Sequence, residues 1–524
     1  MSAAAASPAK PVNPWVIALA VSIATFMEVL DTTITNVSLT HIAGSLGAGQ
    51  DESTWVLTSY LVSNGIVLPL SGWLSNVFGR KKYFLFCIAG FTLASFACGA
   101  ATSLGMLIAF RLLQGIAGGG LQPTQQAIIL DAFPPHMRGS AFAITGITLI
   151  AAPVIGPTLG GWITDNFDWR WIFFINVPFG IIAMLLVSNL VKDSEHTKAQ
   201  GAGQIDFIGL GLISLGLGAL QIVLDKGQQD DWFESTFILT TALISAFSLT
   251  GAVVWLLTRK DPIVDLKLLK IPSFGLSFIL IFFTGFVLYG GTLLLPLMVQ
   301  SLMGYDSTLS GMLLSPGGIA VIILMPIVGK LINIVPAKYL VMTGLLLSAI
   351  GMYHTSFLAP TVDYETLVWM RITQVLGLPF LFIPISTLAY MHIPQAKNNK
   401  ASALFALGRN LGGSVGIALV TTYLVRHTQI NHNVLAGHAG ITDPTWQATL
   451  HHTAQFYINQ GAGLTEALKD ATVRLYQTMQ KQASFLAYSD SYKMLTYVLL
   501  GAIGLAMFLP KNTPGKGGAP AGAH

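Results

Sequence analysis

The sequence predicts an all-α, polytopic membrane protein. Only 10% of its 524 residues are charged, whereas a soluble protein carries roughly 25%. Apolar residue types make up 53% of the chain, and a soluble protein of this length would need several domains with a charged surface on each. Its 53 Gly and 24 Pro are spread along the apolar stretches, as is usual in transmembrane helices. Lipid is therefore the expected solvent for most of the chain.

Apolar stretches of the length of a membrane span recur along the whole chain. A span needs about 20 mostly apolar residues. Fourteen stretches qualify, and they lie at 15–39, 55–74, 83–101, 104–130, 138–164, 169–190, 206–224, 236–256, 272–299, 308–329, 339–358, 365–390, 401–424 and 492–510. The first stretch lacks a small-residue cleavage site, so we expect it to be retained as a span.

The positions of the basic residues predict the orientation. With the N-terminus in the cytoplasm, cytoplasmic segments hold 17 Lys and Arg, including Arg80, Lys81 and Lys82, and opposite segments hold 7. Cytoplasmic loops of membrane proteins carry such an excess. We therefore expect both termini in the cytoplasm. The net charge of +4 follows from this topology and does not indicate a nucleic-acid partner.

Two acidic residues, Glu28 and Asp31, lie inside the first span. A charge in mid-membrane costs about 2.5 to 3.5 kcal/mol on insertion scales and tends to mark an ion or substrate pathway. Their spacing of three places both on one helix face. Either acid could instead be paired with a basic neighbour in a purely structural role.

The first and second halves of the chain are related by an internal repeat. Arg111 and Gln114 form an RxxQ pattern that recurs 260 residues later as Arg371 and Gln374. Arg138 and Lys400 open equivalent spans with an offset of 262. Parallel repeats are common in transporters. The predicted layout is six spans, two inserted spans and six more, with both acids in the first half only.

Two motifs place small residues where helices must approach closely. Between the second and third spans, the segment from Gly72 to Gly79 forms a glycine turn followed by Arg80 and two lysines. The fifth span carries small and helix-bending residues that could favour either close packing or a conformational role. These are Gly146, Pro153, Gly156, Pro157 and Gly160.

These motifs resemble those of the major facilitator superfamily. The first resembles its signature loop, although the family usually has an acid where this chain has Asn76, and the second resembles its antiporter motif. The segments Leu30–Val37 and Trp169–Gly180 narrow the resemblance to the 14-span drug:proton antiporters, and within them to the EmrB type. The resemblance implies a major facilitator fold with a 6 + 2 + 6 arrangement.

The resemblance also implies a function, which is proton-coupled efflux of hydrophobic, drug-like compounds across a cell inner membrane by alternating access. Asp31 is the expected proton carrier and Arg111 its neighbouring cation. Glu28 is not part of the family motif, but the helix face that it shares with Asp31 suggests a second proton site or a counter-charge for cationic drugs. The alternative is an exporter or symporter of an endogenous metabolite or lipid. The sequence has no nucleophile triad, phosphate loop or metal-ligand spacing, so we predict no enzyme, cofactor or metal site.

Further polar residues inside spans are candidates to line a substrate cavity, although an interhelical hydrogen bond is the alternative role for each. They are Asn36, Asn64, Gln114, Gln122, Gln125, Gln126, Arg371 and Arg409. Arg371 and Arg409 have no acid within the spans of their own half, so they could meet carbonyl groups, the two acids or an anionic substrate.

A long segment without a span, 425–491, contains an amphipathic helical pattern around Leu464 to Met479. The resemblance implies that it faces the periplasm and docks a membrane-fusion adaptor (EmrA-like) that leads to an outer-membrane channel (TolC-like). A helix resting on the transporter or on lipid is the alternative.

The predicted organisation along the chain comprises six segments. They are a cytoplasmic tail (1–14), an N-terminal six-helix bundle (15–190), two inserted helices (206–256), a C-terminal six-helix bundle (272–510), the long segment (425–491) within that bundle, and a cytoplasmic tail (511–524).

Overall fold

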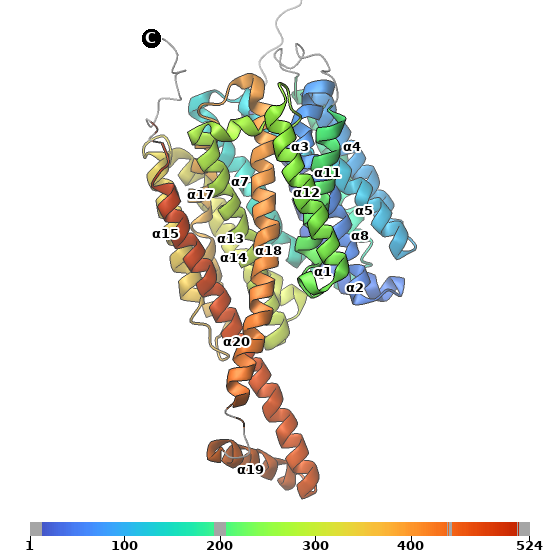
Figure 1. Cartoon of the computed structure of the whole chain (residues 1–524), viewed down its shortest axis with the longest axis vertical. Helices are drawn as coiled ribbons and strands as arrows, with labels where there is room; N and C mark the ends of the chain where they lie inside the picture. Colours follow the sequence, from blue (N-terminus) through green and yellow to red (C-terminus); the bar gives the residue numbers. More distant parts are fainter. Residues whose placement is uncertain (1–12, 193–205, 438, 440–442, 511, 513–524) are drawn as a thin grey trace, which may run out of the picture.

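The computed structural model confirms the all-α fold class. It describes residues 13–192, 206–437, 439, 443–510 and 512, and these residues contain helices and no β-strand. Of the two expected tails, 1–14 and 511–524, all residues except 13, 14 and 512 lie outside the described residues. The helices form one elongated bundle, from which a helical hairpin projects at one end (Figure 1).

The first part of the chain folds into nine α-helices. They are α1 (Pro14–Leu46), α2 (Gln50–Ser53), α3 (Trp55–Phe78), α4 (Arg80–Gly99), α5 (Leu104–Gly118), α6 (Leu121–Ala132), α7 (Arg138–Asn166), α8 (Trp171–Phe174) and α9 (Asn176–Leu190). In the described residues from 206 to the second repeat, the chain forms α11 (Phe207–Lys226) and α12 (Thr236–Thr258).

The last part of the chain forms eight α-helices. They are α13 (Pro272–Met303), α14 (Ser307–Leu331), α15 (Ala337–Thr355), α16 (Tyr364–Val375), α17 (Leu378–Ala389), α18 (Asn398–Gly437), α19 (Pro444–Asn459) and α20 (Leu464–Ala506). Short 3-10 turns at Pro135–Met137, Trp232–Glu234, Leu266–Lys270 and Gln395–Lys397 connect the α-helices.

Twelve stretches of the described chain are long and apolar enough to cross a membrane, so the expected count of fourteen is not reproduced. Most of the two remaining ranges, 339–358 and 492–510, is nevertheless helical, in α15 up to Thr355 and in α20 up to Ala506. In α20 the charged residues Asp490 and Lys493 directly precede the apolar part. They lower the mean hydropathy of the window there.

Two of the expected spans are each divided by a short break. The range 104–130 is split between α5 and α6, and the range 365–390 between α16 and α17. Gly119 lies at the first break and Gly377 at the second. A Cβ on Gly119 would lie 2.7 Å from the carbonyl oxygen of Asn64 on α3, so the break lets two helices touch. The breaks occur at equivalent positions of the predicted repeat.

Helices of the two halves lie side by side along the middle of the bundle. On α7 and α14, Ser140 Oγ donates to the Gly329 carbonyl at 3.0 Å, and the Thr158 and Ser315 hydroxyl oxygens are 3.5 Å apart. The inserted helix α11 packs between α3 and α18, where Ser414 Oγ donates to Gln221 Oε1 at 2.9 Å. The inserted helices therefore contact both halves.

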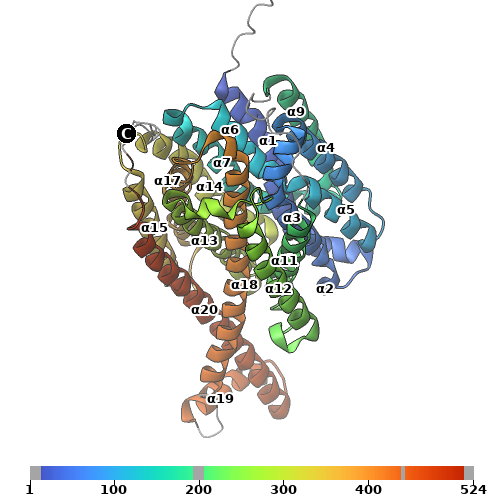
Figure 2. The same cartoon turned by 45° about the horizontal axis from the view of Figure 1, so that its top comes forward.

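The two ends of the bundle differ. We call the end where α1 begins and α20 ends the terminal face, and the end from which α19 projects the hairpin face (Figures 1 and 2). The hairpin consists of α19 and the first part of α20, which pack through buried Ala454, Ala467 and Ala471. α20 continues without interruption from the hairpin into the bundle.

Candidate functional site

The site is built around α1, which carries both predicted acids deep inside the bundle. The exposed fraction of Asp31 is 1% and that of Glu28 is 4%. Asn13 caps the N-terminus of α1 and Pro14 occupies its first turn, so the helix begins at the terminal face and its 33 residues place both acids near its middle. Although the acids are three residues apart, they have different partners.

Asp31 is held by an ion pair and two amide donors. Arg111 Nη1 lies 2.5 Å from Asp31 Oδ2, while Gln114 Nε2 and Asn176 Nδ2 donate to Asp31 Oδ1 at 3.0 and 2.7 Å. The guanidinium also lies over the Tyr60 ring, 4.3 Å from its centroid. Three donors, one of them a cation, thus bind the carboxylate oxygens, so Asp31 is a charge that this conformation stabilises.

The RxxQ motif acquires a concrete role in this cluster. Arg111 and Gln114 lie one turn apart on α5, Gln114 Oε1 accepts a hydrogen bond from Arg111 Nη1 at 2.7 Å, and both side chains contact Asp31. In the second half, Arg371 Nη1 likewise donates to Gln374 Oε1 at 3.3 Å. Arg371 forms no ion pair within the described chain, and the stretch equivalent to the two acids, Leu288 to Gly291, contains no acid.

Glu28 has only neutral donors around it. Gln122 Nε2 donates to Glu28 Oε2 at 2.8 Å, and Asn64 Nδ2 donates to Glu28 Oε1 at 3.1 Å. The Tyr60 hydroxyl approaches the same oxygen at 3.4 Å. Tyr60 therefore touches both acid clusters, through its ring at Arg111 and through its hydroxyl at Glu28.

Gln122 also connects Glu28 to the second half of the chain. While its amide nitrogen donates to Glu28, its amide oxygen accepts a hydrogen bond from Arg409 Nη2 on α18. Arg409 is 3% exposed. A buried relay, Glu28–Gln122–Arg409, thus crosses from α1 through α6 to α18.

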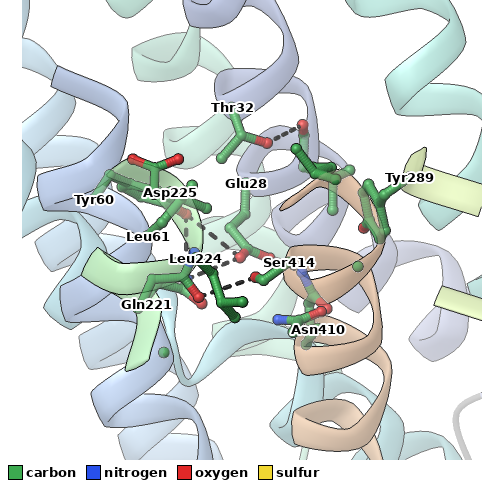
Figure 3. Close-up of a pocket in the computed structure, with 16 residues that line it drawn as sticks. Glu28, Thr32, Tyr60, Leu61, Gln221, Leu224, Asp225, Tyr289, Asn410 and Ser414 are labelled. Carbon is green, nitrogen blue, oxygen red and sulfur yellow. Dashed lines mark hydrogen bonds between the residues drawn. The ribbon is translucent and has the colours of Figure 1, made fainter. Parts of the chain in front are cut away.

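A cavity of about 130 Å³ lies beside Glu28 (Figure 3). Its polar walls come from both halves and from the inserted helix α11. They are formed by Glu28, Thr32, Tyr60, Asn64, Gln122, Gln221, Asp225, Tyr289, Asn410 and Ser414. Asp31 is not among the lining residues, so the two acids face different surroundings, one a sealed ion pair and the other an open space.

Of the predicted cavity residues, Asn64 and Gln122 line this space and the others lie elsewhere. Asn36 is exposed. Gln125 Nε2 donates to Ser22 Oγ at 2.7 Å, and Gln126 is 2% exposed. Gln114 belongs to the Asp31 cluster, and Arg409 reaches the cavity only through Gln122.

The loop motif forms a seal between the halves at the terminal face. Arg80 pairs with Asp131, and Arg80 Nε donates to Asn399 Oδ1 on α18 at 2.8 Å. Asn399 Nδ2 in turn donates to Asn76 Oδ1 at 2.5 Å, so Asn76 joins the seal as an amide. A Cβ on Gly72 would lie 2.8 Å from the Asn399 carbonyl oxygen, and Gly79 has a φ of 86°, so both glycines are required by the backbone here.

The small residues of the fifth span place α7 between α1 and α14. Gly156 and Gly160 lie against Thr33 and Ile34 of α1, next to the acids, while Gly146 faces Met325 of α14. Pro153 and Pro157 lie inside α7, which remains one helix. The motif therefore sets the distance between the acid-bearing helix and the second half.

Sequence reasoning missed four residues of the site. Asn176 falls within a quoted motif but was given no role, and Tyr60 carries no charge to reveal it. Gln221 and Asp225 lie one turn apart on α11 and so share a face. The expected span ends at 224, one residue before Asp225, which leaves this acid outside the predicted spans. Its spacing from Gln221 was the available signal.

Comparison with known proteins matches residues 21–417 to the model of the Major Facilitator Superfamily. Multidrug export protein EmrB of Escherichia coli is 35% identical over 510 residues, which cover 97% of this chain and 98% of that protein. Fatty acid resistance protein FarB of Neisseria gonorrhoeae is 39% identical over 448 residues, 85% of this chain and 87% of that protein.

Solved structures extend the comparison at the level of the fold. A double tryptophan mutant of XylE superposes with a TM-score of 0.63 at 13% identity, over 96% of this chain and 97% of that one. The family model covers most of the chain, the relatives match over nearly its full length, and the helical bundle agrees with both. This chain therefore belongs to the Major Facilitator Superfamily of membrane transporters.

Proposed function

We propose that this protein is a proton-coupled multidrug antiporter of a cell inner membrane, with both termini in the cytoplasm. The observation that carries the proposal is that the two acids of α1 have different surroundings. Asp31 forms a buried ion pair with Arg111, whereas Glu28, one turn away, faces a cavity. The likeness to proteins named multidrug export proteins supports this direction of transport.

Protonation of Asp31 supplies the coupling step. A neutral carboxyl cannot hold the Arg111 guanidinium as an ion pair, so proton binding releases Arg111 and Gln114 from α1. Because Tyr60 contacts both Arg111 and Glu28, the rearrangement reaches the cavity directly. Proton entry from the hairpin side then favours release of the drug, and loss of the proton on the cytoplasmic side restores the binding form.

The size of the cavity indicates that the structure describes a closed conformation, in which the cavity is too small for a drug. At about 130 Å³ it is smaller than the roughly 300 to 1,000 Å³ of pockets for drug-sized ligands. Drug binding therefore requires the two halves to move apart. The moving units of this proposal are the bundles 15–190 and 272–510, with 206–256 inserted between them, and the contact that opens is the link from Gln122 to Arg409.

The projecting hairpin supports a second level of the proposal, a tripartite pump. A periplasmic adaptor (EmrA-like) would dock on α19 and the first part of α20 and lead to an outer-membrane channel (TolC-like). Deletion of 440–485 should spare transport in inverted vesicles and abolish resistance in cells. Loss of transport in vesicles as well would contradict the docking role.

The decisive experiment measures proton release on drug addition to the detergent-purified protein, in wild type and Asp31→Asn. We expect release from the wild type and none from the variant. Asp265→Asn is the matched control, because Asp265 pairs with Lys397 outside the site. Release that persists in Asp31→Asn would overturn the coupling role, and proton uptake instead of release would favour the symporter alternative.

A further inference from the structure

A second acid, Asp225, lines the cavity from the inserted helix α11. It lies near the end of α11, and its carboxylate accepts a hydrogen bond from the Thr58 hydroxyl on α3. Within the described chain Asp225 forms no ion pair. Gln221, one turn earlier on α11, lines the same cavity (Figure 3).

The position of Asp225 is not explained by the stability of its helix. An acid in the last turn of a helix faces the negative end of the helix dipole, where anions are unfavourable by about 0.3 to 1 kcal/mol. An ionisable residue inside a membrane protein is itself costly and is expected to serve a function. Since the helix dipole opposes this carboxylate and the carboxylate forms no ion pair within the described chain, its role lies in the cavity that it faces.

Other polar groups of the cavity wall also lack protein partners. Gln221 is 9% exposed, and while its Oε1 accepts from Ser414 Oγ, its Nε2 donates to no described residue. The Asn410 side chain and the Tyr289 hydroxyl line the cavity without a hydrogen bond to the described chain. The wall therefore presents hydrogen-bonding groups toward the space where a ligand would lie.

The charge of the wall selects the class of ligand. None of the 16 lining residues is Lys, Arg or His, and two of them, Glu28 and Asp225, are carboxylates. The ring of Tyr289 adds a surface that attracts cations. The two carboxylates of the wall therefore attract an organic cation and repel an anion of the same size.

We propose that Asp225 and Gln221 form a subsite for the positive charge of an organic cation, on the hairpin side of Glu28. Thr58 lies in the first turn of α3, which begins at the hairpin face, and Glu28 lies near the middle of α1. A cation that leaves Glu28 for the hairpin face therefore passes Asp225. The subsite rests on the proposed export function and assigns the inserted helix a role in substrate selection.

The test uses two probes of nearly equal size and opposite charge, tetraphenylphosphonium and tetraphenylborate, with equilibrium binding to the purified full-length protein. We expect Asp225→Asn to weaken binding of the phosphonium about five- to tenfold and to leave borate binding unchanged or stronger. Asp230→Asn, on the exposed loop beyond α11, is the matched control and should alter neither. Equal weakening of both probes, or an unchanged phosphonium affinity, would overturn the subsite.

A second measurement needs no variant and covers the case in which Asp225→Asn fails to fold. A hydrophobic carbodiimide modifies accessible carboxyl groups in apolar surroundings, and mass spectrometry locates the modified residue. Tetraphenylphosphonium should protect Asp225 in the wild type, and tetraphenylborate should not. Absence of protection contradicts the proposal. Neither measurement depends on proton coupling, so a failed Asp31→Asn experiment and a failed subsite remain distinguishable.

Discussion

Arg409 of α18 donates a hydrogen bond to Gln122 of α6, and this bond joins the two halves of the transporter in the middle of the bundle. Because the same Gln122 side chain donates to Glu28, the cavity acid is connected to a cation of the opposite half through a single amide. A change in the charge or position of Glu28 is therefore transmitted to the interface between the halves.

Replacing Gln122 by Leu should loosen this interface. An interhelical hydrogen bond within a membrane is worth about 0.6 kcal/mol on average and up to about 1.7, so we expect a shift of roughly three- to twentyfold toward the open arrangement. Distances between spin labels on α6 and α18 would report the shift. Gln125→Leu is the control, because Gln125 lies on the same helix and bonds Ser22 of its own half. An equal shift in both variants would contradict the assignment.

Loss of the Arg111 charge should destabilise the protein strongly. Arg111→Gln leaves Asp31 as a buried carboxylate without its cation, which costs about 3 to 5 kcal/mol. The double variant with Asp31→Asn should recover much of that loss. Thermal unfolding in detergent measures both effects.

Arg371→Gln is the matched control, since Arg371 is equally buried and equivalent in the repeat but forms no ion pair within the described chain. We expect a smaller loss of stability there. If Arg371→Gln proves as costly as Arg111→Gln, the ion pair is not the source of the effect.

A methyl group at position 72 should open the seal at the terminal face. The Cβ of Gly72→Ala would lie 2.8 Å from the Asn399 carbonyl oxygen, so α3 and α18 must separate. A Ser75→Cys reporter, in a background without Cys87 and Cys98, should then react faster with a soluble maleimide, because Ser75 is 2% exposed in the closed seal.

Gly65→Ala controls for the helix itself. Gly65 lies in the same helix α3, and a Cβ there meets no atom within 4 Å, so the labelling rate should stay at its original value. Unchanged labelling in Gly72→Ala would show that the seal tolerates the separation.

The hairpin should unfold independently of the bundle when its small core is disrupted. Ala471 is fully buried between α19 and α20, so Ala471→Asp introduces a charge without a partner into that contact. Limited proteolysis should cut the turn between the two helices faster, while the bundle stays intact. Thr472→Asp, exposed on the same helix, should leave the cleavage rate unchanged, and faster cleavage there would point to a charge effect alone.

The sequence predicts the fold class, the repeat and the two acids of α1 because each has a local signal. Two acids within an apolar stretch are rare, and the RxxQ spacing places Arg111 and Gln114 on one side of α5. The separation of Glu28 from Asp31 has no such signal. Both lie on the same helix face, and only the packing of α3, α6 and α11 decides which acid faces a cavity.

The remaining differences between prediction and structure arise at the ends of the expected spans. Asp225 was one residue beyond an expected span, and its partner Thr58 comes from a helix 167 residues away in sequence. The range 492–510 was expected as a separate span, whereas α20 runs from Leu464 to Ala506 as one helix. The first part of this helix is polar and the last part is apolar, but the backbone hydrogen bonding continues through both. A prediction from hydropathy therefore separates the membrane span from the polar helix that precedes it.

The continuity of α20 makes it a lever. Its 43 residues form a rod about 65 Å long at roughly 1.5 Å per residue, with one end at the hairpin tip and the other at the terminal face. Tilting such a rod about its crossing with α18 moves its two ends in opposite directions. A force on the hairpin tip would therefore move the end of α20 at the terminal face. In the proposed transport cycle, rocking of the two halves would in turn move the hairpin tip.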